Sequence, residues 1–278
     1  MGDNTLDKFK LNGKICVVTG GAGFLGRKHA EAILDADGIP VLLDIDEERI
    51  NKVISELKSE YKKDVAGFSV DITNKSNLEK ALESIIDKFG RVDVLINNAT
   101  NDPKVDKDES ENNWSRFENF SEEMWNNDID VSVKGAFLCS QVFGAHMARN
   151  QEGVILNMSS DLGVIAPDQR IYEQKRLSEE DQPVKPVTYS VAKHALLGLT
   201  KYLAIYWAKK GLRVNALCPG GVYKNQDDEF VKKLTNLIPM GRMANENEYK
   251  AAILFLISDA SSYMTGSALI IDGGRTCW

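Results

Sequence analysis

Seven short apolar runs recur along the chain, and segments with apolar residues at helical spacing separate most of them. The runs cover 14–20, 39–46, 65–73, 92–99, 153–160, 212–220 and 268–274. Polar residues do not alternate regularly with apolar ones inside these runs, which is typical of strands buried on both faces of a parallel sheet. The intervening segments predict helices over 27–38, 47–63, 75–90, 122–150, 188–210 and 247–258.

Strands that alternate with helices predict an α/β fold, a single-domain, Rossmann-type doubly wound parallel sheet of about seven strands flanked by helices. No linker-like composition interrupts the chain, so we predict one domain over residues 1–278. Two polar insertions, near 100–121 and 164–187, follow strand ends. Ligands of such sheets bind outside the carboxyl ends of the strands, so these insertions predict a lid or substrate rim. The alternative is a pair of solvated loops.

The charge balance narrows the classes of partner. A formal net charge of −7 argues against a general nucleic-acid binder and against binding to anionic membranes. No apolar run reaches the roughly 18 residues of a membrane helix, and the polar start does not resemble a signal peptide. Four widely spaced cysteines, without a CxxC pair, favour a reducing compartment over disulfides or a metal site. We therefore expect a cytoplasmic protein without a bound metal.

A glycine-rich turn lies at the first junction between a strand and a helix. In "VVTGGAGFLG", Gly21, Gly23 and Gly26 form a GxGxxG pattern, and Gly20 adds a fourth glycine. Glycines permit the tight turn and let the backbone approach a pyrophosphate, which the free N–H groups of the helix N-terminus then bind. The turn therefore predicts a dinucleotide site.

Two aspartates at strand ends are candidate contacts for the adenosine half of this dinucleotide. Asp44 ends the second strand, where a carboxylate accepts hydrogen bonds from ribose hydroxyls and repels a 2′-phosphate. This favours NAD over NADP, although Asp46 competes for the role and Asp44 could instead cap the following turn. Asp71 ends the third strand and could accept a bond from the adenine amino group, or act as a turn aspartate.

Tyr189 and Lys193 stand one helical turn apart in "YSVAK". A nearby ammonium favours the phenolate and lowers the pKa of a tyrosine, and the positive charge of a bound nicotinamide would add to the effect. The pair then predicts an acid/base for the interconversion of an alcohol and a carbonyl. The alternative is a chance pair on a surface helix.

The ordered motifs resemble those of the short-chain dehydrogenase/reductase family over nearly the whole chain. They are "TGGAGFLG", Asp44, "VDI" at 70–72, "NNA" at 97–99, "SSDLG" at 159–163, "YSVAK" at 189–193, "RVNALCPGG" at 213–221 and "TGSALIIDGG" at 265–274. The resemblance implies NAD(P)-dependent oxidoreduction of CH–OH groups, with Tyr189 as acid/base and Ser160 orienting the substrate. Lys193 would bind the nicotinamide ribose and lower the tyrosine pKa. The implied cofactor contacts are Gly20, Gly23, Phe24, Leu25, Gly26, Asp44, Ile45, Asp71, Ile72, Asn98, Ala99, Tyr189, Lys193, Pro219, Gly220 and Val222.

The chain departs from the family pattern in three places. The glycine spacing resembles that of the sugar-nucleotide branch, and Phe24 stands where the single-domain branch has a glycine. Ser132 occupies the position of an asparagine that holds a proton-relay water, so we count Ser132 as a catalytic candidate. The "PGG" loop lacks the threonine that binds the carboxamide, and backbone groups such as those of Val222 would replace it.

A closer resemblance concerns oxidoreductases of bacterial surface-sugar gene clusters, including flagellin-modification proteins. It implies a polyhydroxylated sugar or sugar derivative. In the 164–187 loop, the side chains that could bind its hydroxyls or a phosphate, or that could merely keep the loop soluble, are Gln169, Arg170, Tyr172, Lys175 and Arg176. A loop over 222–240 would form the second wall of the substrate site. Two alternatives remain: a sugar-nucleotide epimerase or dehydratase that uses NAD catalytically, and an idle dinucleotide-sensing protein. The resemblance also implies a homodimer or homotetramer built through 122–150, 188–210 and the C-terminal strand, where Trp278 could lie at a subunit contact or cover its own core.

Overall fold

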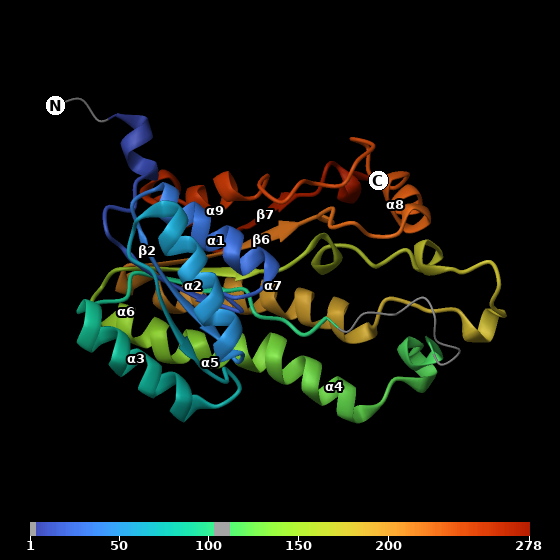
Figure 1. The fold of residues 1–278 in the computed structure, drawn as a ribbon, viewed down its shortest axis with the longest axis horizontal. Helices are drawn as coiled ribbons and strands as arrows, with labels where there is room; N and C mark the ends of the chain where they lie inside the picture. Colours follow the sequence, from blue (N-terminus) through green and yellow to red (C-terminus); the bar gives the residue numbers. More distant parts are fainter. Residues whose placement is uncertain (1–3, 103–111) are drawn as a thin grey trace.

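The computed structural model describes residues 4–102 and 112–278, and a parallel sheet of seven strands forms its centre (Figure 1). The strand order is β3-β2-β1-β4-β5-β6-β7, and every neighbouring pair is parallel. The strands are β1 (Ile15–Thr19), β2 (Ile39–Asp44), β3 (Ala66–Ser69), β4 (Val94–Asn97), β5 (Gly153–Met158), β6 (Leu212–Pro219) and β7 (Ala268–Ile271). The predicted doubly wound α/β fold is therefore confirmed.

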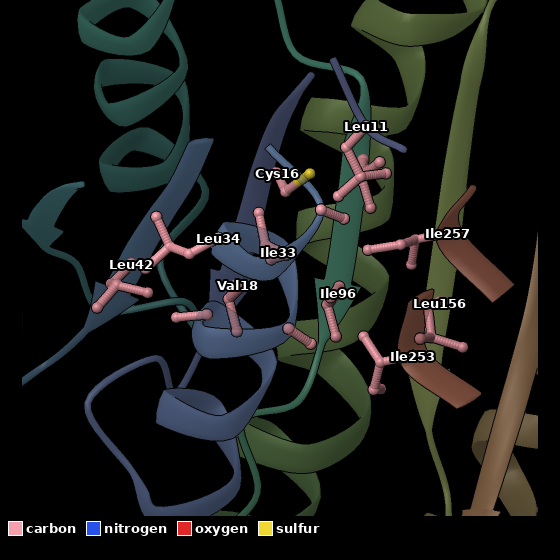
Figure 2. Packing of buried hydrophobic residues seen from close by; sticks show 14 of the residues in the cluster. Leu11, Cys16, Val18, Ile33, Leu34, Leu42, Ile96, Leu156, Ile253 and Ile257 are labelled. Carbon is pink, nitrogen blue, oxygen red and sulfur yellow. The ribbon is translucent and has the colours of Figure 1, made fainter. Parts of the chain in front are cut away.

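The sheet is buried on both faces because successive side chains of each strand point to opposite sides. Ile15 and Val17 of β1 belong to one hydrophobic cluster, and Cys16 and Val18 belong to the other. Figure 2 shows the second of these clusters, in which Val18 and Ile96 of neighbouring strands lie near Ile33 and Ile253 from the covering helices. Apolar residues at consecutive positions are therefore required, as the uninterrupted runs predicted.

Helices cover both faces of the sheet. On the side of Cys16 lie α1 (Phe24–Asp35), α2 (Glu47–Tyr61) and α9 (Lys250–Ile257), which supply residues to that cluster. On the other side lie α3 (Lys75–Phe89), the helical segment that begins at Glu122, and α7 (Val187–Trp207), as Figure 1 shows. Helices on both faces leave the carboxyl edge of the strands free for a ligand.

The helix predicted over 122–150 is interrupted by two π-helical turns. It consists of α4 (Glu122–Ile129), a turn at Asp130–Lys134, α5 (Gly135–Cys139), a turn at Ser140–Gly144 and α6 (Ala145–Arg149). Each π turn adds a residue and changes which side chains face the sheet. The first of them contains Ser132, which it places in the interior.

The expectation of a plain loop over 222–240 was wrong, because α8 (Asp228–Thr235) lies within it. Asp227 begins this helix by accepting hydrogen bonds from the backbone N–H groups of Glu229 and Phe230. Of the two predicted polar insertions, the one near 164–187 contains short 3₁₀ turns, and residues 103–111 of the other lie outside the described residues. Within the described ranges, no helix is both long and apolar enough to span a membrane.

Candidate active site

The glycine turn between β1 and α1 is shaped so that side chains would not fit. A Cβ on Gly26 would lie 2.2 Å from the carbonyl oxygen of Gly20, and one on Gly20 would lie 2.9 Å from the Cα of Ala99. Gly20 also has a φ of +61°, which favours glycine. Gly23 caps α1 without a side-chain hydrogen bond, so no side chain competes for the first N–H groups of the helix. The backbone cradle therefore fits a pyrophosphate.

Asp44 lies at the end of β2, beside this turn. Its Oδ2 accepts a hydrogen bond from the Ala22 N–H at 3.1 Å, and its Oδ1 accepts one from the Ile45 N–H at 2.9 Å. The turn therefore holds the carboxylate in place. The competing Asp46 caps α2 by accepting from the Arg49 N–H at 3.0 Å, which gives it a structural role.

The other predicted adenosine contacts follow β2 and β3. Ile45 is exposed beside Asp44, whereas Ile72 is buried. Oδ1 of Asp71 accepts hydrogen bonds from the backbone N–H and the hydroxyl of Thr73, so Asp71 acts as a turn aspartate, one of its two predicted roles. A role of Asp71 toward adenine stays a prediction.

The "NNA" segment at the end of β4 ties the glycine turn to the centre of the sheet. The Nδ2 of Asn98 donates to the carbonyl oxygens of Thr19 and Gly20, at 2.9 and 3.2 Å. The N–H groups of Asn98 and Ala99 both donate to the Thr19 hydroxyl. Asn98 Oδ1 lies 3.0 Å from Nε2 of the buried His29 on α1. Asn98 thus stabilises the turn that would hold a cofactor.

Ser160, Tyr189 and Lys193 come together beyond the end of β5. Ser160 is buried two residues after the strand, and its hydroxyl lies close enough to the phenol of Tyr189, at the start of α7, to lower the pKa of that phenol slightly. Lys193 Nζ lies 5.5 Å from the centre of the Tyr189 ring and donates to the Met158 carbonyl at 3.0 Å. The spacing of one helical turn therefore does place the two side chains side by side.

The expected lowering of the Tyr189 pKa was wrong for the protein without cofactor. Burial raises the pKa of Tyr189 above its ordinary value, and the negative charge of Asp102 raises it further. The same burial lowers the pKa of Lys193 to about 8, because desolvation disfavours the ammonium. Desolvation therefore outweighs the attraction between the two side chains that the spacing suggested.

A second ammonium, which the sequence analysis did not consider, lies against Tyr189. Lys185 Nζ is 3.8 Å from the centre of the phenol ring and 2.6 Å from Oδ1 of Asp102, which follows β4. The Tyr189 ring therefore lies between two lysines, Lys185 from the loop before α7 and Lys193 from the next turn of α7. No local pattern predicted this contact, because Lys185 precedes the start of α7 and the helical spacing rule does not apply to it.

Ser132 reaches the same edge of the sheet, but its hydroxyl is already engaged. Its Oγ lies 2.9 Å from the Thr100 hydroxyl and accepts a bond from the Asn101 N–H at 3.3 Å. The side chain is 2% exposed. Ser132 thus holds the segment that follows β4, and its place in a proton relay stays a prediction.

The loop after β6 covers the far side of the glycine turn. Gly220 packs so closely that a Cβ there would lie 2.8 Å from the Cα of Asp272, and Val222 pairs with Ala244. Lys224 Nζ lies 4.7 Å from the centre of the Phe24 ring at the start of α1. A cavity of about 470 Å³ beside this contact is lined by Ala22, Gly23, Phe24, Arg27, Lys28, Arg49, Lys52, Val53, Glu56, Lys224 and Glu246.

Comparison with known proteins agrees with this geometry. The family model described as Enoyl-(Acyl carrier protein) reductase matches residues 21–276. The NAD-dependent glycerol dehydrogenase of Listeria innocua is 33% identical over 276 residues, which cover 96% of each chain. Post-translational flagellin modification protein A of Campylobacter coli is 30% identical over 266 residues, which cover 95% of this chain and 98% of that one.

A solved structure extends the likeness to three dimensions. The gluconate 5-dehydrogenase from Burkholderia cenocepacia, in complex with NADP and tartrate, matches with a TM-score of 0.84 and 25% sequence identity. The match covers 99% of this chain and 100% of that one. The chain therefore belongs to the matched family, the single-domain short-chain dehydrogenases/reductases. It is an oxidoreductase of the nicotinamide-dependent kind that this family comprises.

Proposed function

We propose that the protein is an NAD-dependent dehydrogenase that transfers hydride between the nicotinamide and an alcohol or carbonyl carbon of a polyhydroxylated substrate. The observation that carries this proposal is the cluster of Ser160, Tyr189 and Lys193 at the same sheet edge as the glycine turn. The names of the glycerol and gluconate dehydrogenases that the chain resembles support a polyol or sugar derivative.

The residues of the cluster divide the work of the reaction. A bound nicotinamide supplies or accepts the hydride. Tyr189, whose raised pKa keeps it protonated at neutral pH, holds the proton that a carbonyl oxygen receives on reduction. Ser160 would orient that oxygen, and Lys193 would donate hydrogen bonds to the ribose hydroxyls of a bound dinucleotide. For oxidation, the ammonium groups of Lys185 and Lys193 favour the phenolate that removes the hydroxyl proton.

The choice of NAD rests on Asp44. A carboxylate held beside the turn accepts bonds from the ribose 2′- and 3′-hydroxyls and repels a 2′-phosphate. The neighbouring cavity nevertheless contains Arg49, Lys52 and Lys224, which are cations that attract phosphate. Asp44 is thus the residue on which discrimination against NADP depends.

The setting of this activity is proposed from one relative and from exposed side chains. Similarity to the Campylobacter flagellin modification protein supports a role in surface-glycan biosynthesis, carried out in the cytoplasm.

We also propose a homo-oligomer that buries α7. Three side chains of α7, those of Tyr202, Ile205 and Tyr206, are exposed, and the two tyrosine rings stack with their centres 5.8 Å apart. Trp278 is 76% exposed, which supports a subunit contact over coverage of its own core.

The test is a panel of polyols, sugars, sugar phosphates and aminosugars, incubated with NAD and followed by NADH absorbance. The Tyr189→Phe variant should retain NAD binding and lose turnover by roughly 10²–10⁴-fold, the usual contribution of a positioned acid/base. Tyr263→Phe, at a fully exposed tyrosine, is the matched control and should keep its activity. Full activity of Tyr189→Phe would overturn the assignment. Turnover of a sugar nucleotide without net NADH would favour an epimerase instead.

A further inference from the structure

A buried carboxylate contacts the serine of the proposed site. Asp161 is 3% exposed, and its Oδ1 accepts hydrogen bonds from the Ser160 hydroxyl at 2.7 Å and from the Leu162 N–H at 2.8 Å. Its Oδ2 accepts a bond from Nη1 of Arg275, also at 2.7 Å. Arg275 is 6% exposed and lies 114 residues further along the chain.

The C-terminal segment is folded so that it delivers this arginine. Gly273 and Gly274 both have positive φ angles, which turn the chain back after β7. Asp272 then accepts bonds from the N–H groups of Gly274 and Thr276, at 2.9 and 2.7 Å. Beyond the turn, the Trp278 indole donates to the Leu237 carbonyl, and Figure 1 shows the end of the chain beside α8. The tail is therefore anchored on both sides of Arg275.

We propose that Asp161 and Arg275 form a positioning pair that holds the Ser160 hydroxyl against Tyr189, so that the C-terminal segment is part of the active site. The proposal rests on the oxidoreductase function given above and assigns two residues to it. Neither is a catalytic residue, because neither touches the reacting atoms; both act through Ser160.

A serine hydroxyl carries a single proton, so it can donate only one hydrogen bond at a time. A hydroxyl rotates freely unless a strong acceptor fixes it, and a carboxylate is such an acceptor. With the proton directed to Asp161, the lone pairs of the serine oxygen are left free to face the neighbouring phenol of Tyr189. The hydroxyl can then turn its proton to a substrate oxygen from a defined starting geometry.

Arg275 keeps the carboxylate in the form that this role requires. A buried carboxylate without a counter-ion gains a higher pKa, and once protonated it donates to the serine instead of accepting from it. Asp161 also acts electrostatically on four ionisable groups from elsewhere in the chain, which are Tyr172, Tyr189, Cys218 and Tyr249. None of these four side chains carries a positive charge. The cation paired with Asp161 is Arg275.

The Arg275→Met variant tests the pair through its pH profile. With NAD and a substrate found in the panel, kcat should fall about tenfold to a hundredfold, the effect expected of a misplaced reacting group, while the Kd of NAD stays unchanged. Because loss of the counter-ion raises the pKa of a buried carboxylate, the loss of kcat should deepen as pH is lowered. The wild type should lack this added pH dependence.

Two further variants separate positioning from a general loss of structure. The double variant Asp161→Asn with Arg275→Met keeps an acceptor oxygen without a buried charge, so it should recover most of the kcat and lose the added pH dependence. Arg275→Lys keeps the charge and should lie between Arg275→Met and the wild type. Lys63→Met breaks an exposed pair with Asp37, of 2.7 Å, and should match the wild type.

Two results would contradict the positioning role of Asp161 and Arg275. An unchanged kcat in Arg275→Met, or an equal loss at every pH that the double variant does not recover, overturns the positioning role. If Arg275→Met does not fold, the kcat of Arg275→Lys decides: a reduced kcat with an unchanged Kd of NAD supports the positioning role, and a kcat equal to that of the wild type overturns it. A wild type without any NAD-linked turnover overturns the proposed function, and the positioning pair with it.

Discussion

Replacing Lys193 by methionine should change how the stability of the cofactor-free protein depends on pH. The ammonium is 4% exposed, and burial lowers the pKa of Lys193 from an ordinary 10.5 to about 8. The difference corresponds to about 3 kcal/mol. The folded protein therefore carries that cost whenever Lys193 is charged, which is the condition in which it can donate to ribose hydroxyls.

The free energy of unfolding depends on pH because the folded and unfolded chains bind different numbers of protons at Lys193. Below about pH 8, Lys193 is protonated in both the folded and the unfolded chain, and the full cost is present. Between about 8 and 10.5 the unfolded chain binds more protons, so the free energy of unfolding rises with pH. Relative to Lys193→Met, the wild type should therefore gain about 3 kcal/mol between pH 7 and pH 10.5.

The assay is thermal unfolding of wild type and variant without cofactor, at one protein concentration, over this pH range. At roughly 2–4 °C per kcal/mol, the Tm difference between them should change by about 6–12 °C. Lys58→Met, at an exposed position on α2, is the control and should show a Tm difference that is constant with pH. A constant difference for Lys193→Met, or one of opposite sign, would refute the argument that desolvation governs this lysine.

Two predictions concern the cofactor. Gly26→Ala should weaken NAD binding by at least about tenfold in a titration of protein fluorescence, because the new Cβ would lie 2.2 Å from the Gly20 carbonyl oxygen and displace α1 from the cradle; unchanged affinity would mean that the turn does not hold the pyrophosphate. The wild type should bind NAD more tightly than NADP, and Asp44→Ala should narrow the ratio of the two affinities, because the Asp44 carboxylate no longer repels a 2′-phosphate that Arg49 and Lys52 attract; a wild-type preference for NADP would contradict the role of Asp44.

Local sequence patterns were sufficient to predict the strands, the glycine turn and the Tyr189–Lys193 pair. The apolar runs predicted all seven strands, because a strand covered on both faces requires apolar residues at consecutive positions. Gly20 and Gly26 were identified because the tight turn excludes a Cβ at both. The proximity of Tyr189 and Lys193 followed from helical spacing alone.

The tertiary structure decided what depends on burial and on contacts between distant segments. The direction of the Tyr189 pKa could not follow from its neighbour in the helix, because desolvation by the surrounding fold outweighs that ammonium. Asp161 and Arg275 lie 114 residues apart, and no local pattern links a residue after β5 to one after β7. The pairing of Lys185 with Asp102 likewise requires two loops to meet over the tyrosine. Charge placement in a folded site is a property of the assembled chain, since both desolvation and Coulomb energy depend on distances in space.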